Sequence, residues 1–191
     1  ALRLDQKKPG LVLTGSNAGG KTVALKTLGL AALFVRAGIP FPAKRGLRID
    51  FFQSILADVG DAQTLTEGLS TFSAHMLTLK RSLKIADSQS LVLLDELAVG
   101  TDPMQGAALA RVVLQDLVSS GARVVTTTHY AELKGLPAID PRFQSAAVSF
   151  SHGRPTYTLR MGEVGLSHAF AIAAQMGLSE DLIARAKNAL S

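Results

Sequence analysis

Residues 15–22, GSNAGGKT, are the part of the chain whose residue types and spacing most clearly indicate chemistry. They fit the pattern G-x-x-x-x-G-K-[ST] without a mismatch, and they lie between the apolar residues 11–14 and a helical segment, the context that this pattern needs. Glycines let backbone amides turn toward phosphate groups, and the following helix N-terminus adds positive potential. An ordinary glycine-rich turn is the alternative, and the complete spacing and context weigh against it. The predicted nucleotide-binding residues are Gly15, Ser16, Asn17, Ala18, Gly19, Gly20, Lys21 and Thr22.

A second element, residues 91–96 (LVLLDE), is an apolar strand that ends in two carboxylates. In this interpretation Lys21 reaches the β- and γ-phosphates of a nucleoside triphosphate, and Thr22 ligates magnesium. Asp95 would hold the same ion directly or through water, and Glu96 would polarise or orient the attacking water as general base. The alternative is that both acids simply end a strand at the surface, and the loop upstream makes that less favoured.

A glutamate directly after the aspartate is typical of ABC ATPases, whose site is completed by a second subunit. Residues 97–102 are then placed like the D-loop, which crosses the dimer interface and here carries Asp102. His129 follows the next strand, where the switch histidine of this class contacts the γ-phosphate. A lone histidine after a strand is more often a cap or a satisfied polar residue, but its order and spacing favour the functional interpretation. The expected catalytic residues are Glu96, His129 and Lys21, and the expected metal ligands are Thr22 and Asp95.

The elements that must position these residues alternate between apolar strands and helices, which indicates a parallel α/β sheet. Ser167 and Ser179 are expected N-caps of two short closing helices. The expected strands are residues 11–14, 47–59, 90–94 and 123–127, then a hairpin of residues 143–150 and 155–160, and the longer helices are residues 20–37, 70–86 and 106–119. The predicted fold is α/β, a P-loop NTPase of the ABC type with a mainly parallel central sheet flanked by helices, a C-terminal β-hairpin and two short terminal helices.

Composition limits the class of protein. The chain has 191 residues, 47% hydrophobic and 18% charged, which suits one compact domain over residues 1–191. It has no cysteine, which excludes disulfides and thiolate metal sites, and no apolar run approaches the roughly 20 residues of a membrane helix, so a cytoplasmic protein is expected. Residues 1–50 hold nine of the 20 Lys and Arg. This bias could serve nucleic acid, although these cations are spread out rather than clustered.

The chain resembles the MutS family over essentially its whole length. Transporter ABC proteins carry a Leu-Ser-Gly-Gly signature instead of the motifs found here. The family resemblance lies in residues 14–22 (TGSNAGGKT), 70–76 (STFSAHM) and 128–133 (THYAEL). Similarity to the second bacterial subfamily, called here MutS-two, exceeds that to the mismatch-repair branch in residues 95–103 (DELAVGTDP), 69–73 (LSTFS) and 121–125 (GARVV). Residues 162–172 and 177–187 also look like the helical tail that helps these ATPase domains to dimerise.

The resemblance implies ATP and Mg²⁺ as cofactors and a homodimer in which each of two ATPs is clamped between protomers. Ser70, Thr71 and Asp102 would act in trans, on the nucleotide of the opposite subunit. Asn17 would contact the γ-phosphate, while Ser16 stands where the family usually has proline. Since proline fixes φ and serine does not, this departure should loosen the loop slightly. Val99 replaces a small residue near the D-loop, which puts the packing of the interface in doubt.

For function, the resemblance implies ATP-driven control of a nucleic-acid clamp that suppresses homologous recombination through branched DNA; a ribosome-rescue role, with contacts to rRNA, is the alternative. The clamp and lever regions and the Smr nuclease domain of such proteins have no counterpart in these residues, so we expect an isolated ATPase domain whose DNA contacts lie largely elsewhere. A switch module that hydrolyses ATP slowly and the motor of mismatch repair remain open. A membrane-transporter ATPase is disfavoured by the missing signature.

Overall fold

The computed structural model describes residues 4–16, 19–60, 71–151, 154–165 and 169–189. Its central feature is a six-stranded sheet with the order β2-β3-β4-β1-β5-β6. The first five strands in this order run parallel, and β6 pairs with β5 in the antiparallel direction. This confirms the predicted mainly parallel α/β sheet and the closing hairpin. The strands are β1 Gly10–Thr14, β2 Ser54–Asp58, β3 Ser90–Leu94, β4 Arg123–Thr127, β5 Phe143–Ser151 and β6 Arg154–Met161.

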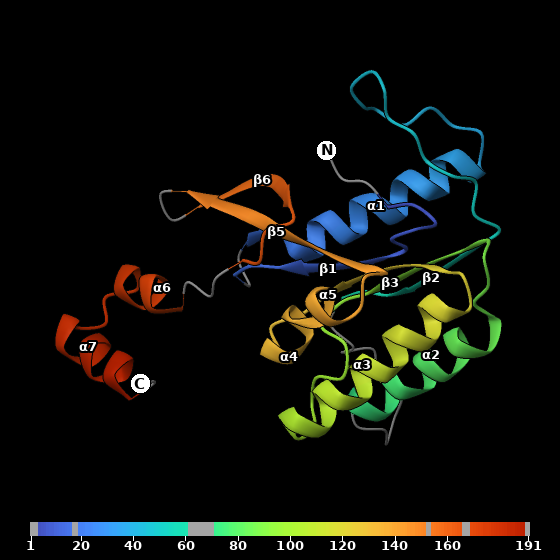
Figure 1. Ribbon diagram of the computed structural model, residues 1–191. Coiled ribbons are helices and arrows are strands. Elements are labelled where there is room, and N and C mark those ends of the chain that lie inside the picture. The colour runs from blue at the N-terminus through green and yellow to red at the C-terminus, as the bar shows by residue number, and fades with distance from the viewer. Residues whose placement is uncertain (1–3, 17–18, 61–70, 152–153, 166–168, 190–191) are drawn as a thin grey trace.

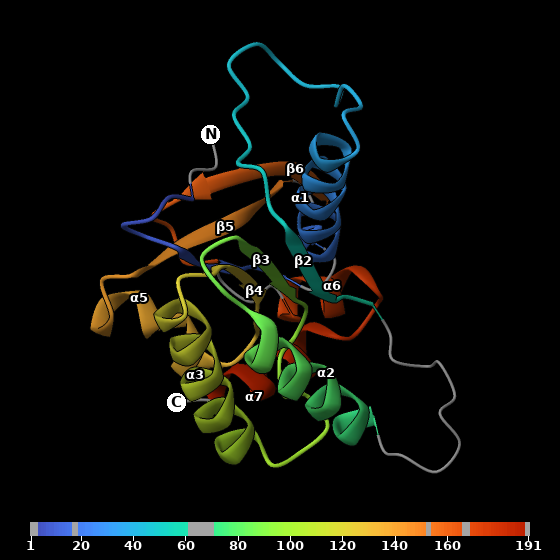
Figure 2. The ribbon, with the colours of Figure 1, turned by 90° about the vertical axis from the view of Figure 1, so that its right-hand side faces the viewer.

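Helices cover both faces of the sheet (Figures 1 and 2). One face is covered by α1, and the other by α2 and α3, whereas α6 and α7 stand apart from the sheet. None of the helices in the described part of the chain has the length and apolar character needed to cross a membrane. The helices are α1 Lys21–Arg36, α2 Thr71–Ile85, α3 Pro103–Ser119, α4 Ala131–Lys134, α5 Leu136–Ile139, α6 Ala169–Gln175 and α7 Glu180–Asn188.

The sheet holds together because its three central strands, β1, β3 and β4, are buried at every position. Side chains that alternate along a strand point to opposite faces, so each strand contributes to two apolar clusters. Leu11 and Leu93 belong to the cluster on the α1 side, together with Leu25 of that helix. Val12 and Val92 belong to the cluster on the side of α2 and α3. This double burial explains the continuous Leu and Val runs of the sequence.

Strand β2 and helix α3 differ in extent from the prediction, and two short helices were not predicted. Strand β2 is shorter than the predicted residues 47–59, because its ladder begins where Ser54 meets Ser90, the first residue of β3. Helix α3 begins before the predicted residue 106, because Asp102 caps it by accepting from the Gln105 amide and Pro103 suits a first helical turn. The short helices α4 and α5 were not predicted. Ser179 is the N-cap of α7, as predicted, and Ser167 lies outside the described residues.

A buried polar cluster fastens the end of α5 to β5 and α3. Asp140 accepts from the Arg142 side chain, with Nη2 at 2.6 Å and Nε at 2.9 Å, and from Gln115 Nε2 at 3.3 Å. Asp140 is 6% exposed. The hydrogen bonds from Arg142, helped by that from Gln115, hold the pKa of the Asp140 carboxyl at about 2 against its desolvation.

Replacing Asp140 with Asn is expected to lower the free energy of unfolding at neutral pH by about 1–2 kcal/mol. The ionised carboxylate contributes stability above the ordinary carboxyl pKa, and this contribution disappears as the pH falls through about 2. The difference from wild type should therefore shrink between pH 4 and 2, roughly. Urea unfolding at a series of pH values measures it, with Asp116→Asn on the exposed side of α3 as control. A difference that does not change with pH would contradict this account.

Candidate functional site

The predicted site residues converge at one edge of the sheet. Because β1, β3 and β4 are parallel, their carboxyl ends meet there, and β4 lies between the other two. The glycine-rich loop, residues 15–22, leaves β1 at this edge and leads into α1. Asp95 and Glu96 follow β3, and His129 follows β4. Ligands of open parallel α/β sheets bind at this kind of edge.

The glycine-rich loop turns sharply into α1. Gly15 and Gly20 have φ values of 131° and 90°, in the region that favours glycine. The Gly19 amide donates to the Ser16 carbonyl at 2.9 Å. Gly20 is the N-cap of α1 and supplies no side-chain cap, so the positive end of the helix dipole faces the loop. Asn17, also predicted to bind nucleotide, lies with Ala18 outside the described residues.

Lys21 is buried in the loop, with only 2% of its surface exposed. Its Nζ donates to the carbonyls of Gly15 at 3.0 Å and Ser16 at 3.2 Å. Burial lowers the pKa of Lys21, while the carboxylates of Glu96 and Asp95 act in the opposite direction. Burying an ammonium is costly unless it is hydrogen-bonded or paired, and here backbone carbonyls and nearby carboxylates offset part of that cost. This environment therefore fits a phosphate better than an apolar ligand.

Ser16 adds a second observation that fits a phosphate ligand. Its side chain is 6% exposed, and its Oγ has no hydrogen-bond partner among the described residues. Buried hydroxyls are normally hydrogen-bonded, so this atom has capacity for an additional acceptor. Together with the Lys21 ammonium and the first-turn amides of α1, it makes a set of donors suited to a polyphosphate.

Thr127 joins the two predicted acidic residues. Its Oγ1 donates to Asp95 Oδ1 at 2.6 Å and accepts from the Glu96 backbone amide at 2.9 Å. Glu96 has a φ of 50°, and the bond to Thr127 helps to hold this uncommon backbone conformation. The sequence interpretation assigned no role to Thr127. Its position at the last residue of a buried strand beside the strand of Asp95 is the signal that would have indicated one.

The structure also brings His129 to Glu96. Its Nδ1 lies 4.0 Å from Glu96 Oε1, with the side chains 46% and 35% exposed. The edge of the site is thus open to solvent at the two predicted catalytic side chains, whereas Lys21 is enclosed. An enclosed cation beside an accessible acid and an imidazole suits binding of a charged ligand and activation of water at its exposed end.

Residues 97–102 form a turn that is fixed from both sides. The buried Tyr130 donates through its hydroxyl to the Ala98 carbonyl at 3.1 Å, and Ala98 has a φ of 62°. At the end of the turn, Asp102 is exposed and caps α3 by accepting from the Gln105 amide at 2.9 Å. Asp102, which is predicted to lie at a subunit interface, therefore also stabilises the start of α3 in its own chain.

The structure describes both predicted metal ligands, but only one of the two predicted trans-acting residues at the start of α2. Thr22, in the first turn of α1, is half-buried, and Asp95 lies at the same sheet edge. In the described part of the chain there is no group of three or more His, Cys, Asp or Glu that could hold a metal. A magnesium ion would therefore need hydroxyl, phosphate and water oxygens besides one carboxylate, as Mg²⁺ commonly does. Ser70 lies outside the described residues, and Thr71 is the first residue of α2.

Residues near the C-terminus enclose the loop from the other side, which the sequence interpretation missed. The Gly165 amide donates to Thr14 Oγ1 at 2.6 Å, and a Cβ on Gly165 would lie 2.6 Å from the Gly15 Cα. A Cβ on Gly20 would lie 3.2 Å from the ring of Tyr157, whose side chain is 70% exposed. Tyr157 thus offers an aromatic surface beside the start of α1.

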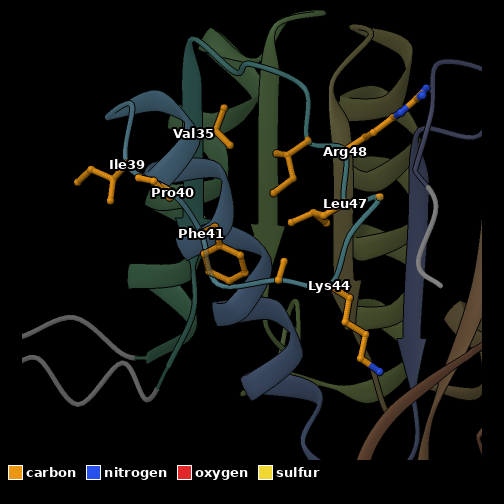
Figure 3. A pocket seen from close by; sticks show the side chains of 10 residues that line it. Val35, Ile39, Pro40, Phe41, Lys44, Leu47 and Arg48 are labelled. Atoms are coloured by element: carbon orange, nitrogen blue, oxygen red, sulfur yellow. The ribbon is translucent and has the colours of Figure 1, made fainter.

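A surface cavity of about 520 Å³ lies elsewhere (Figure 3). It is lined by Val35 at the far end of α1 and by the connection to β2, including Phe41, Leu47, Lys44 and Arg48. Since α1 has 16 residues, roughly 24 Å separates its two ends. The cavity is therefore not part of the site at the glycine-rich loop.

Comparison with known proteins places the chain in a known family. The family described as MutS domain V matches residues 11–191. An Endonuclease MutS2 of Pelotomaculum thermopropionicum is 47% identical over 192 residues, which cover 100% of this chain and 24% of the relative. An Endonuclease MutS2 of Thermomicrobium roseum is 50% identical over 182 residues, 94% of this chain and 23% of the relative. That of Streptococcus thermophilus is 46% identical over 189 residues, 98% of this chain and 24% of the relative.

The chain spans about a quarter of the length of the curated relatives that it matches. The family match covers the glycine-rich loop, both acidic residues and His129. By this match the chain belongs to the MutS family as its domain V, and it is most similar to the MutS2 subfamily.

Proposed function

We propose that this chain is an ABC-type ATPase domain with a P-loop NTPase fold, which binds ATP with Mg²⁺ and hydrolyses it between two copies of itself. The observation that carries the proposal is the convergence at one sheet edge of buried Lys21 with Asp95 and Glu96. The position of β4 between β1 and β3 supports it, because Thr127 of β4 fixes both acids.

Binding would rest on the loop and α1. Lys21 would exchange its present carbonyl acceptors for β- and γ-phosphate oxygens, which are stronger acceptors of a charged donor. Thr22 and Asp95 would hold Mg²⁺. When bound, the ion neutralises charge on the phosphate oxygens. Tyr157, beside Gly20 and largely exposed, would offer its ring to the base.

Hydrolysis would depend on Glu96 as the acceptor of a proton from water. Its backbone amide is held by Thr127, which leaves the carboxylate pointing outward and 35% exposed. His129, with Nδ1 at 4.0 Å from Glu96 Oε1, would lie at the γ-phosphate and respond to its presence. A water between these two side chains and the terminal phosphate would be placed for attack.

A second copy would complete the site. Glu96 and His129 lie at an open edge, and Asp102, which is predicted to act in trans, is exposed. Helices α6 and α7 stand apart from the sheet (Figure 1), and the connection between them and the first turn of α7 expose apolar side chains that a partner would cover. These are Met176 at 75%, Leu178 at 51% and Leu182 at 50% exposure.

The test is the dependence of ATP hydrolysis on protein concentration. If two copies form the site, the rate should rise faster than linearly with concentration until the dimer is saturated. Sedimentation with and without a non-hydrolysable ATP analogue should show a dimer that the analogue favours. A rate strictly proportional to concentration, with a monomer in both samples, would overturn the shared site.

In the longer relatives, such a domain would power a DNA-binding protein. We propose that this chain contributes ATP-driven closure and opening of a clamp on branched DNA, which suppresses homologous recombination. The support is the family match and the name Endonuclease carried by the relatives, which indicates that those proteins act on nucleic acid. Crossover frequency between diverged sequences in cells with and without the active ATPase would test it: an unchanged frequency contradicts the role.

A further inference from the structure

A hydrogen-bonded pair outside the predicted site links α2 to the end of β2. His75 Nδ1 lies 2.7 Å from Asp58 Oδ2, and the two side chains are 12% and 17% exposed. Asp58 is the last residue of β2, and His75 lies in the second turn of α2. The carboxylate can only accept, so the imidazole donates. Such a directional bond between largely buried groups fixes one element against another more specifically than apolar contact does.

Asp58 has a second contact, which reaches the site. The Asp95 backbone amide donates to the Asp58 carbonyl at 2.8 Å, one position beyond the pairing of Asp58 with Leu94 in the sheet. One residue is therefore bonded through its side chain to α2 and through its backbone to the predicted metal ligand. Figure 2 shows β2 and α2 as neighbours at this edge.

His75 lies close enough to the start of α2 for its bond with Asp58 to fix the position of that end of the helix. The helix begins at Thr71, four residues before His75, so the two positions lie one turn apart on the same face of the helix. Phe72 and Met76 pack only partly buried against the core, and contacts of this kind define a face without fixing the helix along its axis. Leu79 anchors the middle of the helix in the core, and the polar bond adds a directional contact closer to its start.

We propose that His75 and Asp58 are positioning residues, which hold the start of α2 in register with the end of β3 so that it fits the partner's nucleotide site. The inference rests on the proposed function, in which Ser70 and Thr71 act in trans. The bond from Asp95 to Asp58 is a backbone bond that continues the β2–β3 pairing, so loss of the His75 side chain should leave the protomer's own site in place.

The decisive experiment mixes two variants of this chain. His75→Ala should lower ATP hydrolysis about 10-fold, while ATP affinity, which depends on its own loop, stays within about 2-fold. Lys21→Met should be inactive because its own loop is damaged. In a mixed dimer, the loop of the His75→Ala protomer meets the intact α2 of the Lys21→Met protomer. An equimolar mixture should therefore recover about one quarter of the wild-type rate by random pairing.

Each outcome has a distinct meaning. A mixture no more active than the mean of its components would overturn the positioning role in trans. If the wild type itself hydrolysed no ATP, or did so without dimer formation, the proposed function would fail first. When the wild type does hydrolyse ATP as a dimer, the first of these results overturns the His75 inference alone and leaves the proposed function standing.

Further variants separate positioning from folding. His75→Asn places an amide donor near the present Nδ1 and should retain most of the rate. The double exchange Asp58→His with His75→Asp should be more active than either single change, since it restores the bond in reverse. Lys80→Ala, on the exposed side of the same helix, should match wild type. Equal losses in His75→Asn and His75→Ala would contradict a role for the hydrogen bond.

Discussion

Replacing Glu96 with Gln is expected to lower the rate of ATP hydrolysis by at least about 100-fold while ATP still binds. Glutamine has nearly the same shape, and the bond from the Glu96 backbone amide to Thr127 does not involve the side chain. What is lost is the carboxylate that would accept a proton from water, 4.0 Å from His129. Single-turnover hydrolysis measured together with nucleotide binding separates the two effects.

The same variant should accumulate as an ATP-bound dimer, because the step that would reopen it is slow. Sedimentation in ATP should therefore show more dimer than for wild type. Glu132→Gln, on exposed α4, is the matched control and should change neither property. Turnover of Glu96→Gln equal to that of wild type would remove Glu96 from the catalytic role.

Replacing Lys21 with Met should weaken ATP binding by at least about 100-fold, which corresponds to the loss of charge-assisted hydrogen bonds to two phosphates. Methionine fills a similar volume but offers no donor. Isothermal titration with ATP and with a non-hydrolysable analogue measures the loss. Lys26→Met, on the exposed side of the same helix, should bind as wild type does.

The thermal stability of the nucleotide-free Lys21→Met chain can be predicted independently of its ATP affinity. Burial lowers the pKa of Lys21, so the charged form is less favourable in the folded chain than in the unfolded one. That cost is fully present at neutral pH and fades as the pH rises toward the ordinary value of 10.5. The nucleotide-free Lys21→Met chain should thus have a Tm at or above that of wild type at pH 7. A clear drop in Tm would indicate that lost packing, and not lost phosphate contacts, weakens binding.

Local patterns predicted the parts of the fold that depend on neighbouring residues. The apolar runs ending at Leu94 and Thr127 became buried parallel strands, because such runs fit a sheet covered on both faces. The glycine-rich loop was predicted from its spacing alone. The extent of β2 was not, since a strand ends where its partner ends, and the pairing of Ser54 with Ser90 is not visible in either segment alone.

In the site, too, residues within short motifs were predicted, whereas residues that act through contacts distant in sequence were not. Lys21, Asp95 and Glu96 were predicted from motifs, and the structure brings them to one edge. Thr127 and Tyr130 were not given roles, although their hydroxyls hold the Asp95 carboxylate and the turn at Ala98. Both bonds cross about 30 residues of sequence, so only the sheet order reveals them.

The enclosure of the glycine-rich loop has a consequence for the order in which the chain can fold. Strand β1 precedes β4 and β5 in the sequence, yet Gly10 pairs with Val124 of β4 and Phe143 of β5. The bond from the Gly165 amide to Thr14 spans 151 residues. Contacts of such long range form late, because the chain between them must be ordered first. During synthesis the loop is therefore made before the residues that enclose it, and its enclosure can be complete only after the closing hairpin and Gly165 have been made.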